Sequence, residues 1–174
     1  MRALFIACLL VACGGGSDSR DAGDFGGRAD ANAMSSYPAV REILTRSCTW
    51  ERCHSGVPIG GNLPLTPGTD YAVSMVNVPS CEYPEYMRVA PGDPEHSWLM
   101  IKLTAQVRPR EDPLADYILF EPAAGWDESK RFCRDHADDG TPLFGQRMPL
   151  TAPNMLPKED IELIRNWIEA GAPH

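Results

Sequence analysis

Four cysteines constrain what this chain can fold into more than any other feature of its sequence. Cys48, Cys53, Cys81 and Cys133 all follow an N-terminal stretch that has the pattern of an export signal. In an oxidising compartment unpaired thiols do not persist, so each of the four needs a disulfide bond, a metal ion or a covalent cofactor. The sequence alone does not decide which cysteines pair with one another.

The start of the chain has the composition of a cleaved targeting segment. Arg2 supplies a positive charge, and the apolar run that follows it ends in Leu10-Val11-Ala12-Cys13. This ending resembles the lipobox of bacterial lipoproteins. The resemblance implies a signal peptide at residues 1–12 and lipidation of Cys13, whose acyl chains anchor a protein without a spanning helix. A plain secretory signal with a chance cysteine is the alternative, and both interpretations place the protein outside the cytoplasm.

The segment after the signal predicts how the folded part is attached. Residues 13–36 are rich in Gly, Ala, Asp and Ser, a composition typical of a flexible tether. The folded domain is expected at residues 37–174. We therefore expect an exported protein, lipid-anchored through Cys13 to the cell envelope, on the periplasmic side or at the outer membrane.

The net charge and the many prolines and glycines exclude several classes of protein. The 174 residues carry a formal net charge of −8, which argues against nucleic acid as a partner because phosphates need cations. No segment approaches the roughly 20 consecutive apolar residues that a membrane span needs. The 16 prolines and 15 glycines are too many for a simple helical bundle. These counts favour one domain of short helices and long loops.

Hydrophobic periodicity predicts three short helices. The first runs from about Tyr37 into Cys48, with apolar side chains three or four positions apart. The second is expected to begin at Asp93 as its N-cap and to extend to Leu103. The third spans residues 157–171, with Pro at its start, acidic residues in its first turn and Gly at its end.

A long insertion separates the second and third predicted helices. Residues 104–146 are polar and interrupted by prolines, which excludes a long helix. A structureless run of this length is unusual in a compact domain, so we expect one short helix near residues 128–134. Cys133 is expected to hold the insertion in place.

The segment Cys48-Thr49-Trp50-Glu51-Arg52-Cys53-His54 has the residue types that attach haem c. In that chemistry two thiols add across the porphyrin vinyl groups to give thioethers, and the adjacent His gives an imidazole nitrogen to the iron. The usual cysteine spacing is i, i+3, whereas here it is i, i+5, which is roughly 140° apart on a regular helix. Residues 49–52 must therefore unwind or bulge to bring both sulfurs to one porphyrin.

A methionine ahead of the third helix supplies a candidate for the other face of the iron. Cytochromes of this kind take a thioether sulfur from a Met on such a loop, and Met148 stands there, followed by a proline that stiffens the backbone. A Met is otherwise common as core filler. His136, in an acidic loop, is the alternative ligand, whereas His96 is expected to face solvent.

With these residues in place, the chain resembles a single-haem c-type cytochrome domain of an exported bacterial lipoprotein. Besides the Cys-His segment and Arg147-Met148-Pro149, the resemblance rests on Val89-Ala90-Pro91-Gly92-Asp93-Pro94, on Ser97-Trp98-Leu99 and on the stretch from Ile161 to Ala172. It covers about residues 38–174, although residues 104–144 have no counterpart in it.

The resemblance implies an all-α, cytochrome c-like fold, with three or more short helices around a haem crevice and a long loop insertion. It implies one haem c attached through Cys48 and Cys53, with His54 and Met148 as ligands of the iron, and it implies that Trp167 packs against the N-terminal helix. The expected function is electron transfer with redox partner proteins. No enzymatic activity is expected, because both axial positions of the iron are filled.

Two further interpretations stay open. The first is a haem-less, lipid-anchored surface or binding module that keeps this fold, with Cys48 paired to Cys53 or to one of the later cysteines. The second is a zinc or copper site of Cys48, Cys53, His54 and one more ligand, although an adjacent Cys and His rarely converge on one tetrahedral ion. Cys81 and Cys133 most simply form a disulfide that closes a loop of about 50 residues.

Overall fold

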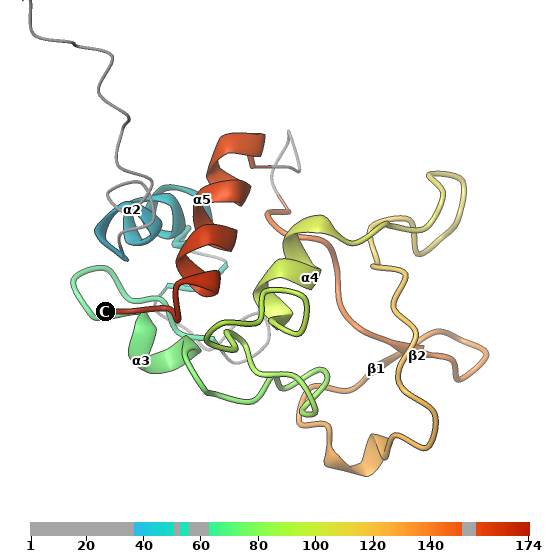
Figure 1. Ribbon diagram of the computed structural model, residues 1–174. Coiled ribbons are helices and arrows are strands. Elements are labelled where there is room, and N and C mark those ends of the chain that lie inside the picture. Colours follow the sequence, from blue (N-terminus) through green and yellow to red (C-terminus); the bar gives the residue numbers. More distant parts are fainter. Residues whose placement is uncertain (1–36, 51–52, 56–62, 151–155) are drawn as a thin grey trace, which may run out of the picture.

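The structure, a computed structural model, describes residues 37–50, 53–55, 63–150 and 156–174. The expected signal peptide, the lipidation at Cys13 and the tether at residues 13–36 lie outside the described residues. The α-helices gather on one side of the molecule, and the long loops with a small sheet extend to the other (Figure 1). Within the described ranges, no helix has the length and apolar character that crossing a membrane requires.

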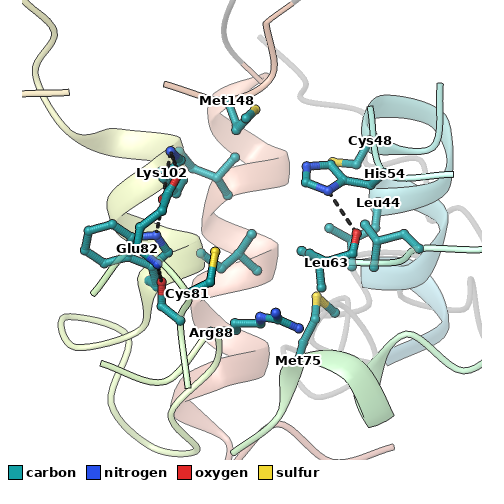
Figure 2. Close-up of a pocket in the computed structure, with 15 residues that line it drawn as sticks. Leu44, Cys48, His54, Leu63, Met75, Cys81, Glu82, Arg88, Lys102 and Met148 are labelled. Carbon is teal, nitrogen blue, oxygen red and sulfur yellow. Dashed lines mark hydrogen bonds and ion pairs between the residues drawn. The ribbon is translucent and has the colours of Figure 1, made fainter. Parts of the chain in front are cut away.

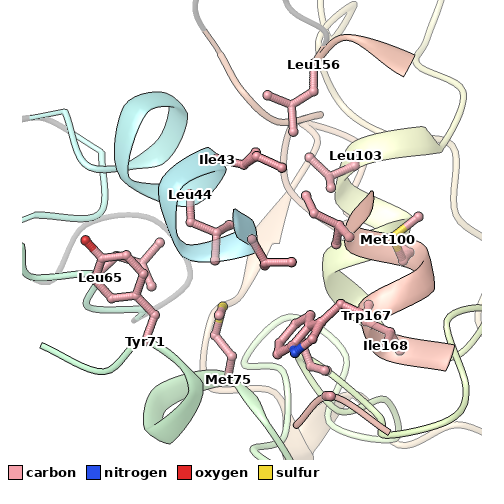
Figure 3. Packing of buried hydrophobic residues seen from close by; sticks show 14 residues of the cluster. Ile43, Leu44, Leu65, Tyr71, Met75, Met100, Leu103, Leu156, Trp167 and Ile168 are labelled. Carbon is pink, nitrogen blue, oxygen red and sulfur yellow. The ribbon is translucent and has the colours of Figure 1, made fainter. Parts of the chain in front are cut away.

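Helices α2 (Tyr37–Cys48) and α5 (Lys158–Glu169) form the centre of the larger hydrophobic cluster, which we call the helical core (Figures 1 and 3). Their apolar side chains recur at helical spacing, so each helix buries one face against the other. The buried side chains are those of Val40, Ile43, Leu44, Ile164, Trp167 and Ile168. Trp167 also stacks on Tyr37, with 5.8 Å between the ring centroids, so it packs against the N-terminal helix.

Helix α4 (Trp98–Thr104) begins later than the expected start at Asp93. The Asp93 carboxylate accepts a hydrogen bond of 3.1 Å from the backbone N–H of His96, so it closes a turn ahead of the helix instead of capping it. The backbone N–H of Trp98 donates to the carbonyl oxygen of Met87 at 2.8 Å. A contact with a distant segment therefore sets the start of α4, and sequence periodicity does not report such contacts.

The prediction of an all-α, cytochrome c-like fold is wrong. The described residues contain four α-helices, including α3 (Ala72–Met75), together with a two-stranded antiparallel sheet. In this sheet β1 (Asp135–His136) pairs with β2 (Pro142–Leu143). Prolines exclude long helices from the insertion, yet its backbone N–H and C=O groups still need partners, and short antiparallel strands supply them. The molecule is a small mixed fold of helices and strands.

The insertion is also more apolar in its packing than its composition suggests. The helix expected near residues 128–134 is a single 3₁₀ turn, η1 (Glu128–Lys130). Around it the insertion joins a second hydrophobic cluster, which we call the aromatic cluster. Its rings belong to Tyr83, Tyr86, Trp98, Phe120, Trp126 and Phe144. Many of them meet edge to face, as Tyr83 and Phe120 do at 4.9 Å between centroids, a favourable arrangement for aromatic rings.

Two further features fasten the insertion to the rest of the molecule. Cys81 and Cys133 are joined by a disulfide bond across a sequence separation of 52 residues. The side chain of Arg131 is fully buried, and its guanidinium lies 4.8 Å from the centroid of the Phe144 ring. The same guanidinium donates a hydrogen bond to the carbonyl oxygen of Leu143. The aromatic cluster therefore has a covalent tie and a buried cation that the helical core lacks among the described residues.

Candidate functional site

A pocket, partly open to solvent, lies between α2, α4 and the segments that carry His54 and Met148 (Figure 2). Most of its wall is apolar, and these residues are Leu44, Leu63, Leu65, Met75, Leu99 and Leu103. Such a wall favours a ligand whose surface is itself largely apolar.

His54 is held in this wall by its neighbours along the backbone. Its N–H donates to the carbonyl oxygen of Cys48 at 3.2 Å, and its own carbonyl oxygen accepts from the N–H of Leu65 at 2.6 Å. The ring nitrogen Nδ1 lies 3.0 Å from the carbonyl oxygen of Leu63 (Figure 2). Because a carbonyl oxygen only accepts, Nδ1 carries the proton and Nε2 keeps its lone pair.

The electrostatic surroundings keep this imidazole neutral. Burial lowers the pKa of His54 below its ordinary value, and the hydrogen bond to Leu63 opposes that shift only in part. The charges of Lys102 and Glu82 also act on the ring, in opposite directions. A neutral imidazole with a fixed tautomer and an unprotonated Nε2 is the form that binds a metal ion.

Of the two cysteines before His54, one lies in the pocket wall. Helix α2 ends at Cys48, which lines the pocket, and burial raises the pKa of its thiol to about 12. Cys53 follows in a turn, with its N–H donating to the carbonyl oxygen of Trp50 at 2.7 Å, and it is not among the pocket-lining residues. Both thiols are free. The chain thus leaves helical geometry directly after Cys48, where the wide cysteine spacing requires it to.

Met148 lines the pocket from a different segment of the chain (Figure 2). Its backbone N–H donates to the carbonyl oxygen of Lys102 at 2.8 Å, which ties the segment to α4. The peptide bond between Met148 and Pro149 is cis. The side chain is partly buried against the helical core. The structure therefore brings Cys48, His54 and Met148 to one cavity, although Met148 is far from the other two in the sequence.

The pocket also contains polar residues that the sequence analysis missed. Glu82 and Lys102 form an ion pair in its wall with 3.1 Å between Nζ and Oε2, and the indole N–H of Trp98 donates to Glu82 at 2.7 Å. One signal could have pointed to Lys102, because it stands one helical turn after Trp98, on the buried face of α4.

Arg88 is a second cation of the pocket wall. Its guanidinium donates to the carbonyl oxygen of Ser74 at 2.8 Å, and burial lowers its pKa. In Figure 2 its side chain lies at the end of the pocket away from Met148.

The remaining histidines lie away from the pocket. His96 faces solvent beside Asp93, with 2.7 Å between Nδ1 and the carboxylate. His136, the alternative ligand, lies in β1 with its Nε2 2.6 Å from the carboxylate of Glu128, and it does not line the pocket. The structure therefore does not bring His136 to His54.

No group of three or more His, Cys, Asp or Glu side chains with metal-binding geometry occurs in the part of the chain that the structure describes. Comparison of the chain with protein-family models, with curated proteins and with solved structures finds no match.

Proposed function

We propose that this protein transfers electrons by means of one haem c, attached covalently in this pocket, with His54 and Met148 as the axial ligands of its iron. One observation carries the proposal. A neutral His54 with an unprotonated Nε2 lines the same apolar cavity as Met148 and Cys48. Imidazole nitrogen, thioether sulfur and adjacent thiols together are the donor set of a c-type haem.

The polarity of the pocket wall suits a haem. A porphyrin is a broad apolar ring, which matches the leucine-rich wall. It also carries two carboxylate groups at one edge, and the wall contains polar side chains as well, among them those of Arg88 and Lys102.

The turn after α2 supports attachment through two cysteines despite their wide spacing. Because α2 ends at Cys48, the angle between positions on a regular helix does not apply to Cys53. The backbone returns so that the N–H of His54 reaches the carbonyl oxygen of Cys48. Each attachment adds one S–H across one vinyl double bond, which forms a C–S bond, moves the hydrogen to carbon and requires no oxidant.

A bound haem supplies one-electron exchange between Fe(II) and Fe(III). The roles of this chain's own residues follow from their positions. His54 and Met148 would hold the iron from two segments of the chain and leave it no position for a substrate, and the apolar wall would limit the access of water. This arrangement favours an electron carrier that acts with redox partner proteins over an enzyme.

We propose further that the protein is exported and anchored by a lipid on Cys13. The disulfide between Cys81 and Cys133 supports this location, because such bonds persist outside the cytoplasm.

The test is to express the full chain with the cytochrome c maturation machinery. The expected product stains for haem on a denaturing gel and gives an alkaline pyridine spectrum of one haem per chain. Cys48→Ala with Cys53→Ala should abolish the stain, whereas the matched pair Cys81→Ser with Cys133→Ser should keep it. A colourless wild-type protein would overturn the proposal.

The haem-less binding module is the second candidate, and disulfide mapping by mass spectrometry decides between the two. A Cys48 or Cys53 peptide in a disulfide would favour the module. The free state of both thiols, beside a bonded Cys81 and Cys133, supports the haem protein instead.

A further inference from the structure

A buried ion pair stands in the wall of an otherwise largely apolar pocket. The Nζ of Lys102 lies 3.2 Å and 3.1 Å from the two carboxylate oxygens of Glu82 (Figure 2). The side chains are only 9% and 15% exposed. Both also bind neutral groups, since Trp98 donates its indole N–H to Glu82 and Lys102 donates to the carbonyl oxygen of Phe144 at 3.2 Å.

Stability alone does not account for this pair. Removing two charges from water opposes folding, and the attraction between them typically only offsets that penalty. Burial accordingly lowers the pKa of Lys102, while Glu82 raises it. In some proteins a buried pair of this kind fixes a particular geometry of the fold.

The segment that leads to Met148 packs directly against the pair of Glu82 and Lys102. Gly145 has a φ of +71°, and a Cβ atom there would lie 2.1 Å from Oε1 of Glu82 and 2.4 Å from Nζ of Lys102. Only glycine fits this position. Three residues later the N–H of Met148 donates to the carbonyl oxygen of Lys102. The pair and its helix therefore serve as the surface against which the Met148 segment is placed.

The same two charges also reach the other candidate ligand. Lys102 disfavours and Glu82 favours a positive charge on the ring of His54, so the site between His54 and Met148 lies within their field. Removing one charge leaves the opposite charge without its partner beside this site.

We propose that Glu82 and Lys102 are positioning residues of the redox site: they hold the segment that bears Met148, and their opposite charges set the reduction potential of the group bound beside it. This inference rests on the proposed function, because a potential exists only if a haem is attached. Neither the Cys-His segment nor the proposed iron ligands imply this role for Glu82 and Lys102.

The first test measures the reduction potential of the haem-loaded protein in four variants. Glu82→Gln leaves Lys102 unpaired and should raise the potential, because a nearby positive charge favours the reduced iron. Lys102→Met leaves Glu82 unpaired and should lower it. The double variant should return close to wild type. Glu95→Gln removes the same kind of charge from an exposed pair with Arg165, away from the pocket, and should change the potential least.

A merely structural role gives a different pattern. If the substitutions only loosened the Met148 segment, both single variants would lower the potential together, because a Met ligand raises it. Shifts in the same direction, or a Glu82→Gln effect equal to that of Glu95→Gln, would overturn the field part of the proposal.

The second test does not require haem. In the haem-free chain, hydrogen exchange of the Met148 amide should be faster in both single variants than in wild type and Glu95→Gln, since the side chains of the pair lie against Gly145, three residues before Met148. Unchanged exchange would overturn the positioning part. If wild type takes up no haem at all, the proposed function fails, and the amide measurement still decides whether the pair holds this segment.

Discussion

The helical core and the aromatic cluster are built by different means. The helical core joins α2 and α5 through aliphatic side chains and Trp167 at regular spacing along each helix. The aromatic cluster joins rings scattered from Tyr83 to Phe144, a disulfide and a buried Arg131. The candidate site lies where they meet, since Leu44 and His54 come from one side and Trp98 and Glu82 from the other. Residues of a helix with regular apolar spacing thus form one wall of the pocket. Segments held by contacts between residues far apart in sequence form the other.

The largest expected effect concerns the thiol of Cys48 on the helical side. Burial raises its pKa from 9.0 to about 12, so at about pH 8 its thiolate fraction is about 1,000-fold below that of an unperturbed thiol. In the haem-free chain, iodoacetamide should modify Cys48 much more slowly than a small reference thiol, and the rate should rise with pH up to about 12. Mass spectrometry measures the rate. An equal rate in folded and urea-unfolded protein would contradict a buried thiol.

The next effect separates the two clusters directly. Replacing Cys81 and Cys133 by Ser removes a tie across 52 residues, which should lower the free energy of unfolding by about 4 kcal/mol. Urea unfolding measures the loss, and Cys53→Ser is the control because that thiol is free. Hydrogen exchange should rise in residues 104–146 before it rises in α2 and α5. A uniform rise across the chain would mean that the two clusters are not separately stabilised.

Arg131 tests whether the aromatic cluster depends on its buried cation. Arg131→Met keeps most of the volume but removes the contact with the Phe144 ring and the hydrogen bond to Leu143. The free energy of unfolding should fall by about 2 kcal/mol. Lys130→Met, at an exposed neighbouring position, is the matched control and should change it by less than about 0.5 kcal/mol. Equal losses in the two variants would show that the buried cation does not stabilise the aromatic cluster.

The smallest effect compares the packing of the two clusters. Ile164 in the helical core is 0% exposed and Ile118 in the aromatic cluster is 4% exposed. Because both positions are close-packed, Ile→Val should lower the free energy of unfolding by about 1 kcal/mol at each. Thermal or urea unfolding of the two variants checks this. A negligible loss at Ile118 alone would show that the aromatic cluster is loosely packed.

These differences explain how much of the fold could be predicted from the sequence. The bounds of α2 and α5 agree closely with the prediction, because apolar periodicity and terminal residues are local signals. The start of α4 was misplaced because a hydrogen bond to Met87 determines it. The all-α fold was wrong because the insertion forms a local hairpin of β1 and β2, whose strands of two residues each are too short to show an alternating apolar pattern.

The candidate site divides in the same way. Cys48, His54 and Met148 were found from residue type and order, and they line one pocket. Glu82 and Lys102 were missed because charged residues are mostly exposed, and only tertiary structure shows that these two are buried as a pair.

The most direct test of the central claim is the red-end absorption band that a thioether sulfur gives when it binds ferric haem iron. We predict this band in the purified, haem-loaded full chain, its loss in Met148→Leu and its survival in Met75→Leu, which removes another sulfur from the same pocket wall. A band that is absent from wild type, or that is lost with Met75 and kept without Met148, would contradict the account.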